Sequence, residues 1–121
     1  ISYEDAYSIL VGTLIKKNDL IIYLSGSGNS MNLIKCAKKA KDFDITQASI
    51  TAFSGGALKN IVDIPIHTRI NDMEIAEDVQ MIIFHYLKQK LTYLFVKSSD
   101  NFNIMQKYNK RTLDDLISWF I

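Results

Sequence analysis

The segment DLIIYLSGSGNSMN, residues 19–32, decides how the rest of the chain is expected to fold. Residues 20–24 are an unbroken apolar run bounded by polar residues, which is typical of a strand buried in the middle of a parallel sheet. Six small or polar residues follow. Apolar residues then recur at helical spacing, at Met31, Ile34, Ala37 and Ala40. The pattern predicts a buried strand, a tight polar loop and a helix.

The loop of this segment, residues 25–30, has the composition of an anion-binding site. The first N–H groups of a helix have no backbone partner and carry partial positive charge. Gly26 and Gly28 allow a close approach of the backbone and a positive φ, and Ser30 is a favourable N-cap. Further hydroxyl donors come from the other serines of the loop, Ser25 and Ser27. We therefore expect the loop to accept phosphate.

Nucleotide binding does not follow from this loop. No Gly-Lys-Ser/Thr sequence continues it, and Met31 stands where a dinucleotide fingerprint has its third glycine. A serine-glycine turn that only caps a helix would use the same residue types, so the residues alone leave both interpretations open.

Three stretches of the chain resemble one family. The sequence SGSGNS after an apolar strand resembles the phosphate loop of sugar isomerase (SIS) domains, and SGNSMNLIKCAKKA resembles the phosphoheptose isomerase branch. Residues 51–66, TAFSGGALKNIVDIPI, match that branch's second glycine turn and next strand, and residues 71–85 match its last core helix. The resemblance covers roughly residues 3–91 and implies an α/β fold, a three-layer αβα sandwich with a parallel, flavodoxin-like sheet, incomplete at the N-terminus.

The same resemblance assigns roles to individual residues. It implies that substrate phosphate is bound by the first loop, through Ser25, Gly26, Ser27, Asn29 and Ser30. Ser54 would contact substrate, although the family often has Asp there, and Gly26 stands where the family often has Thr. His85 falls on the family's catalytic histidine, although its place between Phe84 and Tyr86 suits a core histidine equally well. Glu77 stands where better-known members have Gln and is the second catalytic candidate.

The activity implied is aldose–ketose isomerisation of a phosphorylated sugar, with proton transfer between C1 and C2 through an enediolate. In the family an upstream helix adds a His and a Glu, for which this sequence has no counterpart, so activity of this chain alone is left open. Some relatives hold zinc with these four positions; only two are present here, Glu77 and His85, and no cofactor is certain. A non-catalytic SIS domain that binds a sugar phosphate, and a structural subunit, are the alternatives.

Composition limits the other classes of function. The net charge of +1 gives no basic field for nucleic acid, and no apolar run approaches a membrane span or a signal peptide. The single cysteine, Cys36, excludes an internal disulfide, and it lies beside the apolar face of its helix, where a packing role is expected. We expect a cytoplasmic protein that forms a homodimer or homotetramer, as the family typically does.

The remaining elements follow from periodicity. A helix is predicted over residues 3–16 with Ala6, Ile9, Leu10, Thr13 and Leu14 on its buried face. Strands are predicted within residues 45–53 and 63–68, the second at an edge because it contains Pro65; His67 on it is interpreted as structural or surface-exposed. A helix over residues 73–94, capped by Asn71 and Asp72, is apolar around most of its circumference, so burial on two sides is expected. We expect a SIS domain over residues 1–95 and an extension over 96–121 with a short amphipathic helix from Thr112.

Overall fold

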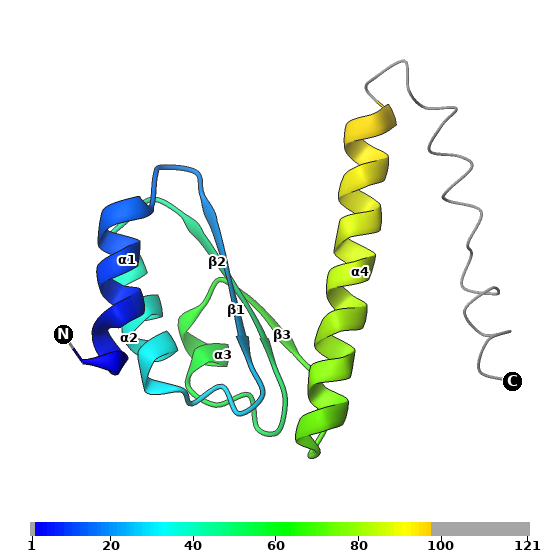
Figure 1. The fold of residues 1–121 in the computed structure, drawn as a ribbon, viewed down its shortest axis with the longest axis horizontal. Helices are drawn as coiled ribbons and strands as arrows, with labels where there is room; N and C mark the ends of the chain where they lie inside the picture. The colour runs from blue at the N-terminus through cyan, green and yellow to red at the C-terminus, as the bar shows by residue number, and fades with distance from the viewer. Residues whose placement is uncertain (1, 98–121) are drawn as a thin grey trace, which may run out of the picture. The chain divides into compact units, whose positions relative to one another are not determined.

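A computed structural model describes residues 2–97 of the chain (Figure 1). These residues form two units, the first ending at Gln80 and the second beginning at Met81. The elements in chain order are η1 (Tyr3–Asp5), α1 (Ala6–Leu14), β1 (Leu20–Ser25), α2 (Met31–Ala40), β2 (Thr46–Thr51), α3 (Leu58–Ile61), β3 (Ile64–His67) and α4 (Met73–Lys97). The short amphipathic helix predicted from Thr112 lies outside the described residues.

The three strands form one parallel sheet in the order β1-β2-β3. Leu20 to Ser25 pair in register with Thr46 to Thr51, and Ala48 to Thr51 pair with Ile64 to His67. Pro65 lies on β3, an edge strand of this sheet, as predicted from its missing backbone donor. The predicted α/β class with a parallel sheet is confirmed.

β1 is an edge strand, so the prediction of a strand buried in the middle of the sheet is wrong for the described chain. Leu20 is 55% exposed and Leu24 is 45% exposed, and within residues 2–97 the outer side of β1 pairs with no strand. An open groove of about 550 Å³ runs between this edge and α1. An apolar run predicts that a strand is buried, but it does not show whether the element that packs against it belongs to the described part of the chain.

α1 and α2 pack together beside the sheet (Figure 1). The core of this layer joins Val11 of α1 to Tyr23 of β1 and to the apolar side of α2, which buries Ile34, Cys36, Ala37 and Ala40. The packing role expected for Cys36 is thus confirmed. The predicted buried face of α1 is wrong, because Ile9, Leu10 and Leu14 are about half exposed or more and the buried residue is Val11.

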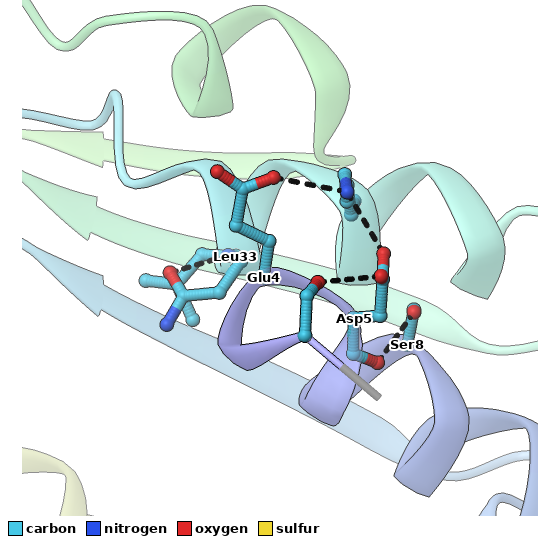
Figure 2. Close-up of polar contacts among 7 residues, drawn as sticks. Glu4, Asp5, Ser8 and Leu33 are labelled. Carbon is cyan, nitrogen blue, oxygen red and sulfur yellow. Dashed lines mark hydrogen bonds and ion pairs between the residues drawn. The ribbon is translucent and has the colours of Figure 1, made fainter.

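A cluster of charged side chains ties the N-terminal turn to α2 (Figure 2). Lys35 Nζ lies 3.1 Å from Glu4 Oε2 and 2.8 Å from Asp5 Oδ1. Asp5 also accepts a hydrogen bond of 2.6 Å from Ser2 Oγ, and its backbone carbonyl accepts one of 2.8 Å from Ser8. These contacts fix η1 and the start of α1 on the helix that follows the polar loop.

The first two turns of α4 belong to the first unit and pack on β2. Ala76 is fully buried, and Gln80 Nε2 donates a hydrogen bond of 3.2 Å to the Ile50 carbonyl. Asp72 caps the helix as predicted, since its carboxylate accepts a hydrogen bond of 3.0 Å from the Ile75 N–H. Beyond Gln80 the helix exposes Met81, Ile82, Tyr86 and Leu94. Burial of a second side of this helix, expected against another subunit, stays a prediction. Within residues 2–97 no helix is both long and apolar enough to cross a membrane.

Candidate functional site

The polar loop between β1 and α2 is held in a compact turn by its own serines. Ser25 Oγ accepts a hydrogen bond of 3.0 Å from the Gly28 N–H and lies 3.4 Å from Ser30 Oγ. Ser27 Oγ accepts one of 3.2 Å from the Asn29 N–H. Gly28 has φ of +69°, a conformation that side chains rarely tolerate. Residues 25–30, called loop 1 below, therefore wrap around the N-terminus of α2.

The N-terminus of α2 keeps donors available beside loop 1. Ser30 occupies the N-cap position, as predicted, but its hydroxyl makes no capping hydrogen bond. The Ser30 carbonyl instead accepts the N–H groups of Leu33 and Ile34, at 3.1 and 3.0 Å. The N–H groups of Met31 and Asn32, at the start of the helix, have no intrahelical acceptor, and the helix dipole places partial positive charge on them. An exposed hydroxyl and these amides together suit an anionic oxygen.

A second glycine turn, residues 54–56, packs directly against loop 1. Gly55 and Gly56 have φ of +84° and +55°, and a Cβ added to Gly56 would lie 2.5 Å from the Gly28 carbonyl group. The Leu58 N–H donates a hydrogen bond of 3.0 Å to the Gly28 carbonyl, and the Ala57 N–H donates one of 3.0 Å to Asn29 Oδ1. The two turns therefore form one rigid platform at the carboxyl ends of β1 and β2, where parallel sheets usually bind ligands.

The positive φ expected at Gly26 is not observed, so the prediction is wrong for this residue, and a neighbouring side chain rather than the backbone favours glycine here. A Cβ at this position would lie 2.5 Å from Met73 Sδ and 3.9 Å from the Phe53 ring. The Met73 thioether therefore fills the space that a hydroxyl-bearing side chain would need. Met73 is 44% exposed, so it also forms part of the surface beside loop 1.

His67 and Lys59, for which the sequence indicated no functional role, both lie close to Gly55 of the second turn. His67, the last residue of β3, has Nε2 at 2.9 Å from the Phe53 carbonyl and Nδ1 at 3.1 Å from Lys59 Nζ. A carbonyl and an ammonium group require Nε2 to donate and Nδ1 to accept. The available signal was the position of His67 at the carboxyl end of a parallel strand, but no motif marked it.

The predicted catalytic residues both lie on α4 and are exposed. Eight residues separate Glu77 from His85, or about 12 Å along a helix axis. Among the described residues, no group of three or more His, Cys, Asp or Glu side chains could hold a metal ion. Ser54, the predicted substrate contact, is exposed, with its hydroxyl 3.4 Å from the Gly56 N–H.

Comparison with known proteins agrees with this architecture. The sequence model of the SIS domain family matches residues 2–96 of the chain. The chain is similar to the phosphoheptose isomerase of Helicobacter pylori (strain ATCC 700392 / 26695), with 32% identity over 85 residues, which cover 70% of this chain and 44% of that protein. It is also similar to the probable phosphoheptose isomerase of Thermoplasma acidophilum, with 30% identity over 86 residues, 71% of this chain and 47% of that one. The chain therefore belongs to the SIS domain family.

Solved structures agree with the fold. A phosphoheptose isomerase structure from Francisella tularensis superposes with a TM-score of 0.67 at 24% identity, covering 70% of this chain and 46% of that one. The phosphoheptose isomerase structure from Neisseria gonorrhoeae gives a TM-score of 0.67 at 22% identity, covering 69% and 48%. The chain spans about half the length of the curated relatives it matches.

Proposed function

We propose that the protein is a phosphosugar isomerase of the phosphoheptose type, and that loop 1 anchors the phosphate of its substrate. The observation that carries the proposal is the platform formed by loop 1 and residues 54–56, in which Gly28 contacts Gly56 at the N-terminus of α2. The similarity to phosphoheptose isomerases over 85 residues supports the same reaction class.

Phosphate binding in this proposal uses the groups of loop 1 that its internal contacts leave available. The hydroxyls of Ser27 and Ser30 and the first N–H groups of α2 donate to phosphate oxygens. Ser25 is buried and shapes the loop through Gly28, and Gly26 lets the backbone come close. Asn29 uses Oδ1 to hold the second turn, which leaves its amide NH₂ group for the ligand.

Anchoring the phosphate end of the sugar holds C1 and C2, the carbon atoms between which a proton is transferred, in a fixed position. We assign His85 as the acid–base group that serves the C1 and C2 oxygens, with Glu77 as the second polar group on α4. Ser54 is assigned to a sugar hydroxyl. Isomerisation through an enediolate also needs a carboxylate base, which the family resemblance places upstream of the matched region.

The substrate is a phosphorylated sugar, and the partner is a second copy of the chain. The apolar side chains that α4 exposes beyond Gln80, among them Met81, Ile82, Tyr86 and Leu94, support a homodimer or homotetramer. A soluble cytoplasmic enzyme fits a substrate of this class. Size-exclusion chromatography with light scattering measures the assembly, and a monomer at micromolar concentration would contradict it.

The reaction is tested directly with sedoheptulose 7-phosphate in D₂O. Isomerisation through an enediolate transfers a proton between C1 and C2 and exchanges it with solvent, so deuterium should appear at carbon in substrate or product. His85→Gln should abolish exchange, while Ser8→Ala, a serine change on α1 away from loop 1, should leave it intact. Binding of the sugar phosphate without exchange or isomerisation would instead support a non-catalytic sugar-phosphate-binding domain.

A further inference from the structure

His67 connects the last strand of the sheet to the second glycine turn. Its Nε2–H group donates a hydrogen bond of 2.9 Å to the Phe53 carbonyl, and its Nδ1 accepts one of 3.1 Å from Lys59 Nζ. The ring is partly buried. Because Lys59 can only donate, it fixes the tautomer in which Nε2 carries the proton.

Phe53 is the residue at which the chain leaves β2 for the second turn, and its backbone is strained. Its φ is +50°, in the left-handed region that a bulky side chain rarely adopts. Two hydrogen bonds hold this residue from outside the turn, the His67 bond to its carbonyl and the bond of 2.8 Å from its N–H to the Ile70 carbonyl. Strain of this kind persists only when surrounding contacts fix the conformation.

The position of the second turn determines the shape of loop 1. Gly56 lies against Gly28, and the amides of Ala57 and Leu58 donate to Asn29 and Gly28. A shift of the turn therefore displaces the part of loop 1 that precedes the N-terminus of α2.

Both edge strands support the platform from the same row of the sheet. Ser25, Thr51 and His67 are paired across the three strands, so their side chains lie on one face. Ser25 fixes loop 1 through the Gly28 N–H, and His67 fixes the second turn through the Phe53 carbonyl. Both contacts are side-chain hydrogen bonds to a turn backbone, in which Ser25 accepts and His67 donates, and they come from the two edge strands.

We propose that His67 is a positioning residue of the phosphate-binding site, which seats residues 54–56 against loop 1 by holding the Phe53 carbonyl. The inference rests on the proposed function for its ligand, since loop 1 is assigned there to substrate phosphate. It adds a residue that touches no substrate and acts through Phe53.

The test compares His67→Gln with His67→Asn. A glutamine amide reaches the place of Nε2 and can donate to the Phe53 carbonyl, whereas the asparagine amide is one methylene shorter and reaches only the place of Nδ1. Val11→Ala, in the core of α1 and away from both turns, is the control for general loss of stability. Each full-length variant is examined by amide hydrogen exchange and by titration with inorganic phosphate and sedoheptulose 7-phosphate.

We expect the Ala57 and Leu58 amides of His67→Asn to exchange about tenfold faster and both phosphate ligands to bind about tenfold more weakly, as the loss of one partly buried hydrogen bond implies. His67→Gln should restore both within about threefold. Val11→Ala should lower the unfolding temperature without selective exchange at these two amides.

Equal behaviour of His67→Asn and His67→Gln, or equal exchange at Ala57 and Leu58 in His67→Asn and Val11→Ala, would overturn the proposal for His67. Failure of the unmodified protein to bind any phosphate ligand would overturn the proposed function instead, and the exchange measurement would still decide the role of His67.

Discussion

Met73 occupies the space that a side chain on Gly26 would need, with its sulfur 2.5 Å from the position of an added Cβ. The obstacle is the far part of a flexible side chain that is 44% exposed, so it can move. The φ of Gly26 is not positive, so its backbone accepts other residues. The absence of a side chain at Gly26 thus makes room for the Met73 side chain, and substitutions at the two positions should be energetically coupled.

Gly26→Thr should lower the free energy of unfolding by about 1 kcal/mol, the low end for an overpacked site. Combined with Met73→Ala, which removes the obstacle, the same threonine should cost less, with an interaction energy of about 0.5–1 kcal/mol in a double-mutant cycle. Urea unfolding of the four proteins measures it. Additive effects would show that Met73 does not restrict this position.

Gly28→Ala should be much more damaging, because the obstacle is backbone. A Cβ on Gly28 would collide with the Gly55 carbonyl group, and the φ of +69° alone costs an alanine about 1–2 kcal/mol. We expect a total loss of more than about 3 kcal/mol and no phosphate binding.

Gly12→Ala is the matched control for Gly28→Ala. Gly12 lies within α1, where an added Cβ meets nothing within 4 Å, so alanine should stabilise the helix by about 0.5–1 kcal/mol. Similar unfolding free energies for the two variants would contradict the close packing of the two glycine turns.

Cys36 should react slowly with thiol reagents in the folded protein. Burial raises the pKa of its thiol above the ordinary value of 9.0, so less reactive thiolate is present, and the side chain is only 4% exposed. We expect modification at pH 8 to be on the order of a hundredfold slower than in urea-unfolded protein. Equal rates in folded and unfolded protein would contradict the burial of Cys36, on α2, against Tyr23.

The buried pair of Cys36 and Tyr23 should make the stability of the protein sensitive to high pH. Burial, followed by the charge and hydrogen bond of Cys36, raises the pKa of Tyr23 above 10.0. Groups whose pKa is higher in the folded state stabilise it fully below their unfolded values, and that stability is lost as pH rises through the folded values. The free energy of unfolding should therefore fall as pH rises above about 9, and less steeply in Cys36→Ala. A flat profile for the unmodified protein over pH 9–11 would contradict this prediction.

Lys35 should contribute to acid stability, and only at low salt. A hydrogen bond from Lys35, and a second from Ser2, hold the pKa of Asp5 below 3.8. A carboxyl with a lowered pKa stabilises the folded state above its unfolded pKa, and that contribution is lost as pH falls through the folded pKa.

Lys35→Met should therefore move acid unfolding to slightly higher pH in 20 mM salt. In 1 M salt it should have little such effect, because both side chains are partly exposed, at 38% for Lys35 and 44% for Asp5, and salt screens their interaction. A shift of the same size at both salt concentrations would mean that Lys35 acts through packing.

Periodicity and turn chemistry predicted the local elements well. The strand, loop and helix of residues 19–32 formed because apolar runs, glycines and an N-cap serine act over a few residues, and Asp72 caps α4 for the same reason. The sequence did not reveal that β1 is an edge strand or that Val11 is the buried residue of α1. Both depend on which surfaces the rest of the chain packs against. Residue chemistry indicated an anion at loop 1 but left a simple helix cap equally open, and family resemblance favoured phosphate.

The support of the site was not predictable in the same way. His67 and Phe53 are 14 positions apart, and their contact exists only because β3 pairs beside β2 with Thr51 opposite His67. Likewise, Gly26 and Met73 are matched across 47 positions (73 − 26). A single sequence does not display such pairs, since each residue alone is compatible with several environments.

The central claim is that loop 1 binds the phosphate of a sugar phosphate, and Ser30→Ala tests it most directly. The Ser30 hydroxyl makes no capping bond, so its removal should cost little stability while removing a donor to the ligand. The measurement is a titration of the ¹⁵N-labelled full chain with sedoheptulose 7-phosphate, read at the amides of residues 25–33. We predict shifts concentrated there and about tenfold weaker binding in Ser30→Ala, with Ser8→Ala unchanged. Saturable binding with no shift at these amides, or equal affinity in Ser30→Ala and Ser8→Ala, would contradict the claim.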